Sequence, residues 1–236
     1  MVQFDGGLSP QGPRQLVILG DGLFAEIAHE YFTHDSEYEV VAFAVERGYA
    51  SHSRLCGLPV VEVEDLETTH PPRDHSVHAA VTYAQLNRVR ARLAGEAKAK
   101  GYSLASYVSS RAFVWRNVNL GEHCFIFEDN TVQPFVTVGS NVILWSGNHI
   151  GHHSIVRDNC FISSQVVVSG SCDIGENSFL GVNTAIGNGL TVGRDCWIGP
   201  HCVLTRDVDA GSFYRPARSD KREESSFEIF SVDPTS

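Results

Sequence analysis

Residues 168–204 read VSGSCD-IGENSF-LGVNTA-IGNGLT-VGRDCW-IGPHCV-L, and every group of six begins with an aliphatic side chain. The spacing reaches back to Val108 without an insertion, so seventeen successive aliphatic residues keep it. A period of six fits neither an α-helix, with a period of about 3.6, nor a two-sided strand, with a period of about 2. It predicts an architectural repeat in which each group forms one short strand and one corner.

Two other positions of each group predict a narrow interior. The residue after the aliphatic one is glycine in eight groups, which indicates corners where the backbone turns sharply or takes a positive φ. The residue four positions after the aliphatic one is mostly small, and both are expected to point inward. Five of the six cysteines hold this small position, so we expect reduced thiols in the core rather than disulfides or metal ligands. They are Cys124, Cys160, Cys172, Cys196 and Cys202.

Three groups of six would make one coil of eighteen residues, and stacked coils would pair as parallel strands about 4.8 Å apart. Over residues 108–209 this pattern resembles the hexapeptide-repeat, left-handed parallel β-helix of acyltransferases. The resemblance implies the left-handed winding, because parallel crossover connections are right-handed as a rule.

Composition and charge narrow the possible partners. The chain has 236 residues and a formal net charge of −10, which argues against nucleic acid as a general partner. It has no run of eighteen apolar residues, so no membrane insertion is expected. Residues 1–14 lack a basic start followed by an apolar stretch, so we expect a flexible lead and a cytoplasmic location.

The region in front of the repeat, residues 15–107, has the pattern of a small Rossmann-like α/β domain. An apolar strand over 15–20 leads into Gly20-Asp21-Gly22 and a helical pattern, where a dinucleotide-binding fingerprint would stand. We expect only three or four strands here, too few for the two halves of an NAD site, so the expected ligand is a single nucleotide. The glycines are also compatible with a tight turn that only packs the helix on the sheet.

Candidate ligand contacts follow the strands of this first domain. A strand over 40–45 ends at Glu46, whose carboxylate is suited to accept hydrogen bonds from a ribose, and the amides at a helix start suit a phosphate. A strand over 77–81 leads into Tyr83 and a charged helix over 85–100. The substrate contacts expected in this domain are Gly22, Leu23, Phe24, Val45, Glu46 and Tyr83.

The combination of a Rossmann-like half-domain with a hexapeptide β-helix resembles the bacterial nucleotide-sugar acetyltransferases that modify 4-amino sugars, and the related sialic acid O-acetyltransferases. The resemblance implies that the first domain holds a nucleotide-linked amino sugar and that the β-helix holds acetyl-CoA. It also implies N-acetylation during the biosynthesis of a surface polysaccharide, with no metal.

The catalytic residue is expected at a corner of the β-helix. In the family that this chain resembles, the catalytic histidine follows an aliphatic-x pair, and Ile150-Gly151-His152 matches that placement. His152 is therefore expected to be the general base for direct transfer without an acyl-enzyme. The eighteen-residue spacing places Gly170 one coil from His152, where its backbone N–H is suited to stabilise the oxyanion. The family's acetyl-CoA contacts correspond to Phe161, Gly170, Val182 and Pro200.

The spacing also predicts an oligomer. Val182 and Pro200 share a corner that is not the corner of His152, and one thin prism does not bring two of its corners to one small ligand. A homotrimer with three active sites in the grooves between subunits solves this, and the resemblance implies the same assembly.

The chain departs from the family beside the catalytic histidine and at the C-terminus. A carboxylate is usual next to that histidine, whereas here His153 follows it, so Glu128 of a neighbouring chain or Asp158 is considered as its partner. In the C-terminal segment, 210–236, the family's Gly-x-Pro-Ala-Lys corresponds to Tyr214-Arg215-Pro216-Ala217-Arg218. Arg215 and Arg218 are suited to pair with CoA phosphates.

Three alternatives stay open at this point. One is O-acetylation of a sugar hydroxyl, which demands a stronger base. Another is a zinc enzyme with three histidines across a subunit groove, as in trimeric β-helix carbonic anhydrases. The third is a trimeric scaffold without catalysis whose first domain binds a small molecule. His149 is expected to point outward from a flat face, and His123 and His201 are expected to be exposed.

Overall fold

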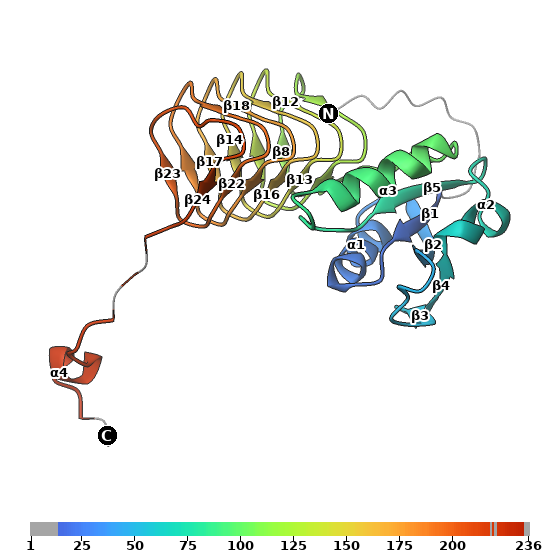
Figure 1. The fold of residues 1–236 in the computed structure, drawn as a ribbon, viewed down its shortest axis with the longest axis horizontal. Helices are drawn as coiled ribbons and strands as arrows, with labels where there is room; N and C mark the ends of the chain where they lie inside the picture. Colours follow the sequence, from blue (N-terminus) through green and yellow to red (C-terminus); the bar gives the residue numbers. More distant parts are fainter. Residues whose placement is uncertain (1–13, 218, 220, 234–236) are drawn as a thin grey trace.

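The computed structural model describes residues 14–217, 219 and 221–233, which form an α/β domain followed by a β-helix (Figure 1). The lead expected over 1–14 lies outside the described residues, except for Arg14, which begins the first strand. The elements of the first domain are β1 (Arg14–Leu19), α1 (Leu23–His34), β2 (Tyr38–Val45), β3 (Arg54–Leu55), β4 (Leu58–Glu62), the 3-10 turn η1 (Val63–Asp65), α2 (Leu66–Thr69), β5 (His75–Ala79), α3 (Arg88–Ala99) and β6 (Ser103–Leu104).

The sheet of the first domain has the order β3-β4-β2-β1-β5-β6, and only the β3–β4 pair is antiparallel. These six strands correct the expectation of three or four. The two-residue strands β3 and β6 give no periodic signal, and β4 is a short edge-side strand that carries Pro59. The long helix starts at Arg88 instead of 85, because Gln85, Leu86 and Asn87 all have positive φ.

Both faces of the first domain's sheet are covered. Leu16 and Ile18 of β1 pack on one side with Ala28 and other buried residues of α1. Val17 and Leu19 pack on the opposite side with α2 and α3. This double burial explains the continuous apolar run of β1. Helix α1 lies between the sheet and the β-helix, so its buried residues pack against both the sheet and the β-helix (Figure 1).

The β-helix is built from three parallel sheets of two-residue strands. The junction face, which packs against the first domain, consists of β7 (Tyr107–Val108), β10 (Phe125–Ile126), β13 (Ile143–Leu144), β16 (Phe161–Ile162), β19 (Phe179–Leu180), β22 (Trp197–Ile198) and β24 (Phe213–Tyr214). The second face consists of β8 (Phe113–Val114), β11 (Thr131–Val132), β14 (His149–Ile150), β17 (Val167–Val168), β20 (Ala185–Ile186) and β23 (Val203–Leu204). The third face consists of β9 (Asn119–Leu120), β12 (Thr137–Val138), β15 (Ile155–Val156), β18 (Asp173–Ile174) and β21 (Thr191–Val192).

The strand register confirms the eighteen-residue coil. Ile126 pairs with Leu144, Val132 with Ile150, and the same step recurs along all three faces. The aliphatic and small positions form one buried cluster inside the prism. The five repeat cysteines are buried and free, as predicted, while Cys56 is exposed.

The glycines after the aliphatic residues do not turn the chain, contrary to the sequence-based interpretation. The residue three positions after the aliphatic one turns it instead: every such residue from His123 to His201 has a φ between 57° and 75°. The glycines permit close stacking. A Cβ on Gly121 or Gly151 would lie 2.5 Å from a backbone nitrogen of the next coil, a separation that real Cβ atoms do not show.

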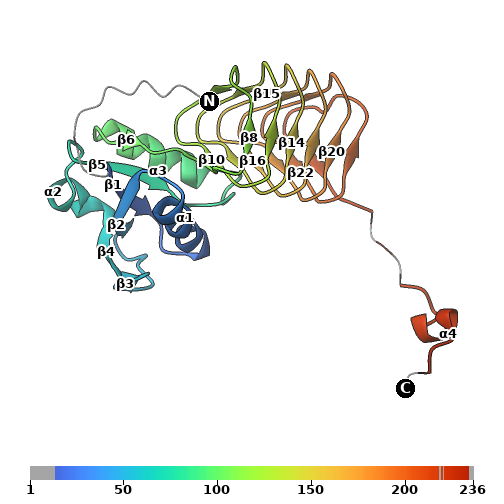
Figure 2. The same cartoon turned by 180° about the vertical axis from the view of Figure 1, so that it is seen from behind.

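The β-helix extends past the expected end at 209. Val208 bridges Val192, and β24 pairs with β22, Phe213 opposite Trp197 and Tyr214 opposite Ile198. This last coil advances sixteen residues instead of eighteen, which explains why the regular spacing did not predict it. The helix α4 (Ser226–Phe230) follows and stands apart from the β-helix in both views (Figures 1 and 2).

Candidate active site

The junction face of the β-helix presents stacked aromatic rings to the first domain. Phe161 stacks on Phe179 with ring centroids 5.6 Å apart, and Phe179 stacks on Trp197 at 3.9 Å. Phe24 of α1 packs on this surface, 5.5 Å from the ring of Phe125. Phe24 is 6% exposed and Phe161 is 4% exposed. Both were expected to contact ligands, and this is corrected: their side chains form the core between the two domains.

A buried polar cluster joins the same two domains. Arg90 is fully buried, and its guanidinium donates to Asn141 Oδ1 at 3.0 Å and to carbonyl oxygens of both domains, including Thr82 O at 2.5 Å and Asn159 O at 3.1 Å. Burial lowers the pKa of Arg90 to about 9. No carboxylate pairs with it among the described residues, so its charge is satisfied by amide and carbonyl oxygens alone.

Two histidines complete this cluster, and one of them overturns an expectation. His123 was expected to be exposed, yet it is buried and stacks on His78 at 4.4 Å. Its Nε2 accepts a hydrogen bond from the backbone N–H of Ala79 at 2.8 Å. Burial lowers the pKa of His78 to about 4 and that of His123 well below its ordinary value, so both imidazoles are neutral. His123 holds a corner position that the repeat alone predicts to be exposed to solvent, and the first domain covers it. His201 is exposed, as expected.

The first domain contains a pocket of about 320 Å³ at the carboxyl ends of β1 and β2. Val45 and Glu46, two predicted contacts, line it together with Gly20, Tyr49 and Arg92. The carboxylate of Glu46 pairs with the guanidinium of Arg92 through two contacts of 2.8 and 2.9 Å. The pocket therefore offers one cation and one anion side by side, a pairing that the sequence did not reveal.

The other predicted contacts of the first domain lie outside the lining of this pocket. Gly22 is the N-cap of α1 and Leu23, which begins the helix, is 80% exposed. Tyr83 is 42% exposed and packs on the aromatic rings of the junction face, 5.2 Å from Phe161. Gly20 has a φ of 124°, and a Cβ there would lie 3.1 Å from the oxygen of Ala80, so the turn between β1 and α1 favours glycine.

His152 stands exposed at the corner between β14 and β15, on the opposite side of the prism from the junction face. Its backbone N–H donates to Gln133 Oε1 at 2.9 Å, and its Nδ1 lies 3.1 Å from Nδ1 of His153. Among the described residues its Nε2 has no hydrogen-bond partner. The ring of His153 stacks on Phe135, one coil earlier, at 4.6 Å. The imidazole is thus held at one nitrogen and open at the other.

Gly170 lies directly beneath this open nitrogen. A Cβ on Gly170 would come within 2.7 Å of Cε1 and Nε2 of His152, so only glycine leaves room for the ring. The N–H of His152 donates to the side chain of Gln133, which lies on the preceding coil. Eighteen residues later, Gly151 holds the position of Gln133 and Gly170 holds the position of His152. Because Gly151 has no side chain, it offers no such acceptor to the N–H of Gly170. Within the described part of the chain the Gly170 N–H has no hydrogen-bond acceptor. The corner thus combines an open imidazole nitrogen with an uncapped amide.

The remaining predicted residues lie on other corners. Val182 and Pro200 are exposed between the junction and second faces, so one chain does not bring them to His152. Asp158 lies between the third and junction faces, and its Oδ1 accepts from Ser140 N at 2.7 Å. Glu128 accepts from the hydroxyl of Tyr31 at 2.7 Å. Neither carboxylate reaches His152 within the chain.

The C-terminal basic residues are only partly described. Arg215 is exposed and its guanidinium lies 5.5 Å from the ring centroid of Phe213, so it remains able to pair with an anion. Arg218 lies outside the described residues. Within the described residues, no three His, Cys, Asp or Glu side chains are grouped as a metal site, and no helix is long and apolar enough to cross a membrane.

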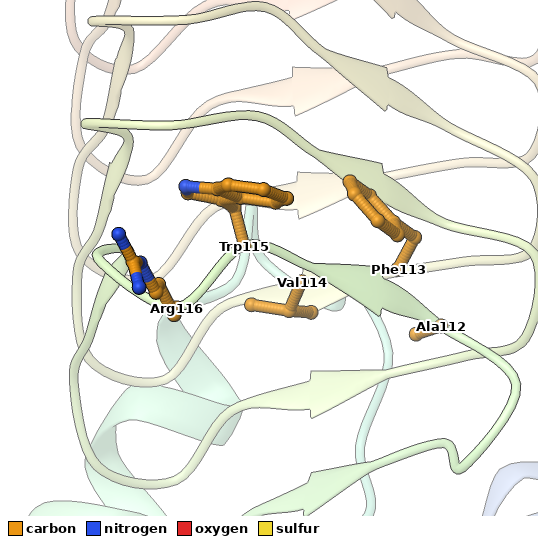
Figure 3. Close-up of a pocket in the computed structure, with 5 residues that line it drawn as sticks. All are labelled: Ala112, Phe113, Val114, Trp115 and Arg116. Atoms are coloured by element: carbon orange, nitrogen blue, oxygen red, sulfur yellow. The ribbon is translucent and has the colours of Figure 1, made fainter. Parts of the chain in front are cut away.

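The second face carries an apolar groove at the first coil that the sequence did not predict. It has a volume of about 540 Å³ and is lined by Ala112, Phe113, Val114, Trp115 and Arg116. Figure 3 shows the rings of Phe113 and Trp115 on either side of Val114, and their centroids are 5.8 Å apart. Arg116 belongs to the same corner column as His152, two coils earlier, so the groove lies on the side of the prism that carries the candidate base.

No protein-family model and no curated relative matches the chain, but solved structures do. One is a histidine-to-asparagine variant of perosamine N-acetyltransferase from Caulobacter crescentus in complex with CoA and GDP-perosamine, 23% identical, with a TM-score of 0.75 over 88% of this chain and 95% of that chain. Another is the acetyltransferase domain of PglB from Neisseria gonorrhoeae, 23% identical, with a TM-score of 0.58 over 87% and 98%. A third is WeeI from Acinetobacter baumannii, 19% identical, with a TM-score of 0.58 over 84% and 94%. The chain therefore has the two-domain fold of these acetyltransferase structures, an α/β half-domain joined to a left-handed parallel β-helix.

Proposed function

We propose that this chain is an acetyl-CoA-dependent N-acetyltransferase that acetylates the amine of a nucleotide-linked amino sugar, in the biosynthesis of a surface glycan. The observation that carries the proposal is the corner where the open Nε2 of His152 faces Gly170, whose own N–H has no hydrogen-bond acceptor among the described residues. Structures with the same fold are those of a perosamine N-acetyltransferase bound to CoA and GDP-perosamine, which supports the assignment of both substrates.

The chemistry follows from these two groups. The amine of the sugar attacks the thioester carbonyl, and Nε2 of His152 accepts the proton that the amine loses. The N–H of Gly170 donates to the oxyanion of the tetrahedral intermediate. The intermediate collapses as the C–S bond breaks, and the proton passes from His152 to the leaving thiolate. The products are an amide and free CoA thiol, and no acyl-enzyme is needed because the thioester is already activated.

The site requires more than one chain. Val182 and Pro200 stay proposed contacts of acetyl-CoA, together with Gly170, and they lie on a different corner of the prism from His152. A homotrimer with one site in each groove brings the two corners of adjacent chains together. Phe161 is withdrawn from the proposed contacts because it is buried beneath the first domain.

The first domain is proposed to hold the nucleotide. The start of α1 at Gly22 presents unpaired backbone N–H groups, which favour a phosphate. The pocket with Glu46 and Arg92 offers an acceptor for ribose hydroxyls and a second charged group for the base or phosphates.

The proposal is tested by measuring thiol release from acetyl-CoA with pairs of nucleotide-linked sugars that differ only in an amine or a hydroxyl at C4. We expect release with an amino sugar and a product whose mass has increased by one acetyl group. Release with only the hydroxyl sugars would replace N-acetylation by O-acetylation. A lack of release with every acceptor, with bound nucleotide-sugar detectable, would favour a binding protein without catalysis.

A further inference from the structure

We propose that His153 is the positioning residue of His152, so that a pair of imidazoles replaces the usual imidazole and carboxylate. The inference rests on the proposed transferase function and specifies how its base is held. His153 sets the tautomer and the orientation of the His152 ring, and His152 alone transfers the proton.

The contact between the rings allows one productive arrangement. The two Nδ1 atoms are 3.1 Å apart, which is a hydrogen-bond distance, and such a bond needs one N–H and one lone pair. When His152 donates from Nδ1, its Nε2 carries the lone pair that faces Gly170 and accepts a proton. When His153 donates instead, His152 carries its proton on Nε2 and is unable to act as a base. The reactivity of His152 therefore depends on the protonation of its neighbour.

The backbone conformation and two contacts fix His153 in this place. Its backbone has a φ of 59° at the turning position of the coil, and its N–H donates to Pro134 O at 3.2 Å. Its ring lies against Phe135 with an angle of 26° between the planes. Phe135 holds the same turning position one coil earlier, with a φ of 65°. The regular stacking of corners thus supplies a ring on which His153 rests.

The groups that bond to or stack on the two histidines are Gln133, Pro134, Phe135 and Ser171, and within the described residues neither ring has an ion-pair partner. The nearest charged residue in the corner column of His152 is Arg116, two coils away. A proton on His153 turns its Nδ1 into a donor and forces His152 into the unproductive tautomer.

The test compares His153→Phe with His153→Asn in the thiol-release assay across pH 5.5–9. Phenylalanine keeps the stack on Phe135 but has no acceptor, so we expect kcat to fall about 10- to 100-fold with the KM for acetyl-CoA unchanged, because a misoriented base loses much of its contribution. Asparagine tolerates the positive φ and offers a carbonyl acceptor, so it should recover part of kcat. His34→Asn, at an exposed histidine at the end of α1, is the control.

Wild-type kcat in His153→Phe would overturn the proposal. The tautomers provide a readout that does not depend on activity. In protein labelled with ¹⁵N-histidine, we expect the nitrogen shifts at pH 8.5 to show the proton of His152 on Nδ1 and that of His153 on Nε2. A proton on Nε2 of His152 would contradict the pairing even if no acceptor sugar supported transfer, which separates this failure from a failure of the proposed function.

Discussion

The corner of the β-helix and the pocket of the first domain differ in how tightly the sequence determines them. At the corner, each residue occupies a numbered place in a repeat, so His152 and Gly170 meet because eighteen residues make one coil. In the first domain, the charged groups of the pocket come from separate elements. Glu46 follows β2, and its partner Arg92 lies on helix α3, 46 residues later in the chain. A repeat thus determines its own site geometry, whereas the first domain's site depends on long-range packing.

The largest effect is expected from His152→Ala. Loss of the proposed general base should lower kcat of acetyl transfer by about 10²- to 10⁴-fold, while KM for both substrates changes little. The measurement is steady-state thiol release, with His34→Ala, at an exposed histidine of α1, as the control. A kcat within a factor of about two of wild type would remove His152 from the mechanism.

The next effect concerns the junction between the two regions. Burial keeps the pKa of His78 at about 4, below its ordinary value of 6.5, so the unfolded chain binds this proton first. The neutral, buried His78 therefore contributes its full share to the free energy of unfolding above pH 6.5. As the pH falls toward 4, the free energy of unfolding decreases by about 3 kcal/mol for this shift. The free energy of unfolding, measured with urea at pH 7 and pH 4 at one protein concentration, should fall by about that much more in wild type than in His78→Phe. Equal falls in both proteins would contradict the buried neutral imidazole.

Gly170→Ala tests the close approach at the corner. The added Cβ would lie 2.7 Å from the ring of His152, so the imidazole must move, and we expect kcat to fall about 10- to 100-fold. The φ of Gly170 is not positive, so the Tm should change little. Ser169→Ala adds no atom at this corner and serves as the control. Full activity in Gly170→Ala would show that the ring does not work in this position.

The smallest effect is expected in the first domain. Glu46→Gln removes the charge that faces the pocket, and the KM for the nucleotide-sugar should rise about tenfold, which is the value of one hydrogen bond to a charged group. The KM for acetyl-CoA and kcat should stay near wild type. Glu96→Gln is the matched control, because Glu96 also pairs with Arg92 but lies outside the lining of the pocket. An equal effect of the two substitutions would place the nucleotide elsewhere.

The six-residue spacing was sufficient to predict the β-helix, its register and the meeting of His152 with Gly170. It did not distinguish a glycine that turns from a glycine that permits close stacking, since both appear as one small residue per group. It also missed the last coil, whose step of sixteen residues breaks the count.

The errors at the junction of the two domains have another physical cause. Phe24 and Phe161 are apolar residues near expected ligand sites, and their side chains face the other domain instead of a ligand. His123 occupies a turning position that would be exposed in an isolated β-helix, and α/β residues cover it. The sequence pattern of one domain holds no information about the surface that packs on it. The contact of His153 with His152 was missed for a related reason, because it depends on the left-handed backbone of one corner residue.

The central claim is that two corners from adjacent chains build one transfer site, and mixed trimers test it most directly. His152→Ala lacks the base, and Pro200→Trp blocks the proposed acetyl-CoA contact on the other corner, so each should be inactive alone. Co-expressed chains should recover about a quarter of the wild-type rate, because random assembly leaves about one groove in four with both intact corners. No recovery in the mixture, or full activity of Pro200→Trp by itself, would contradict a site shared between subunits.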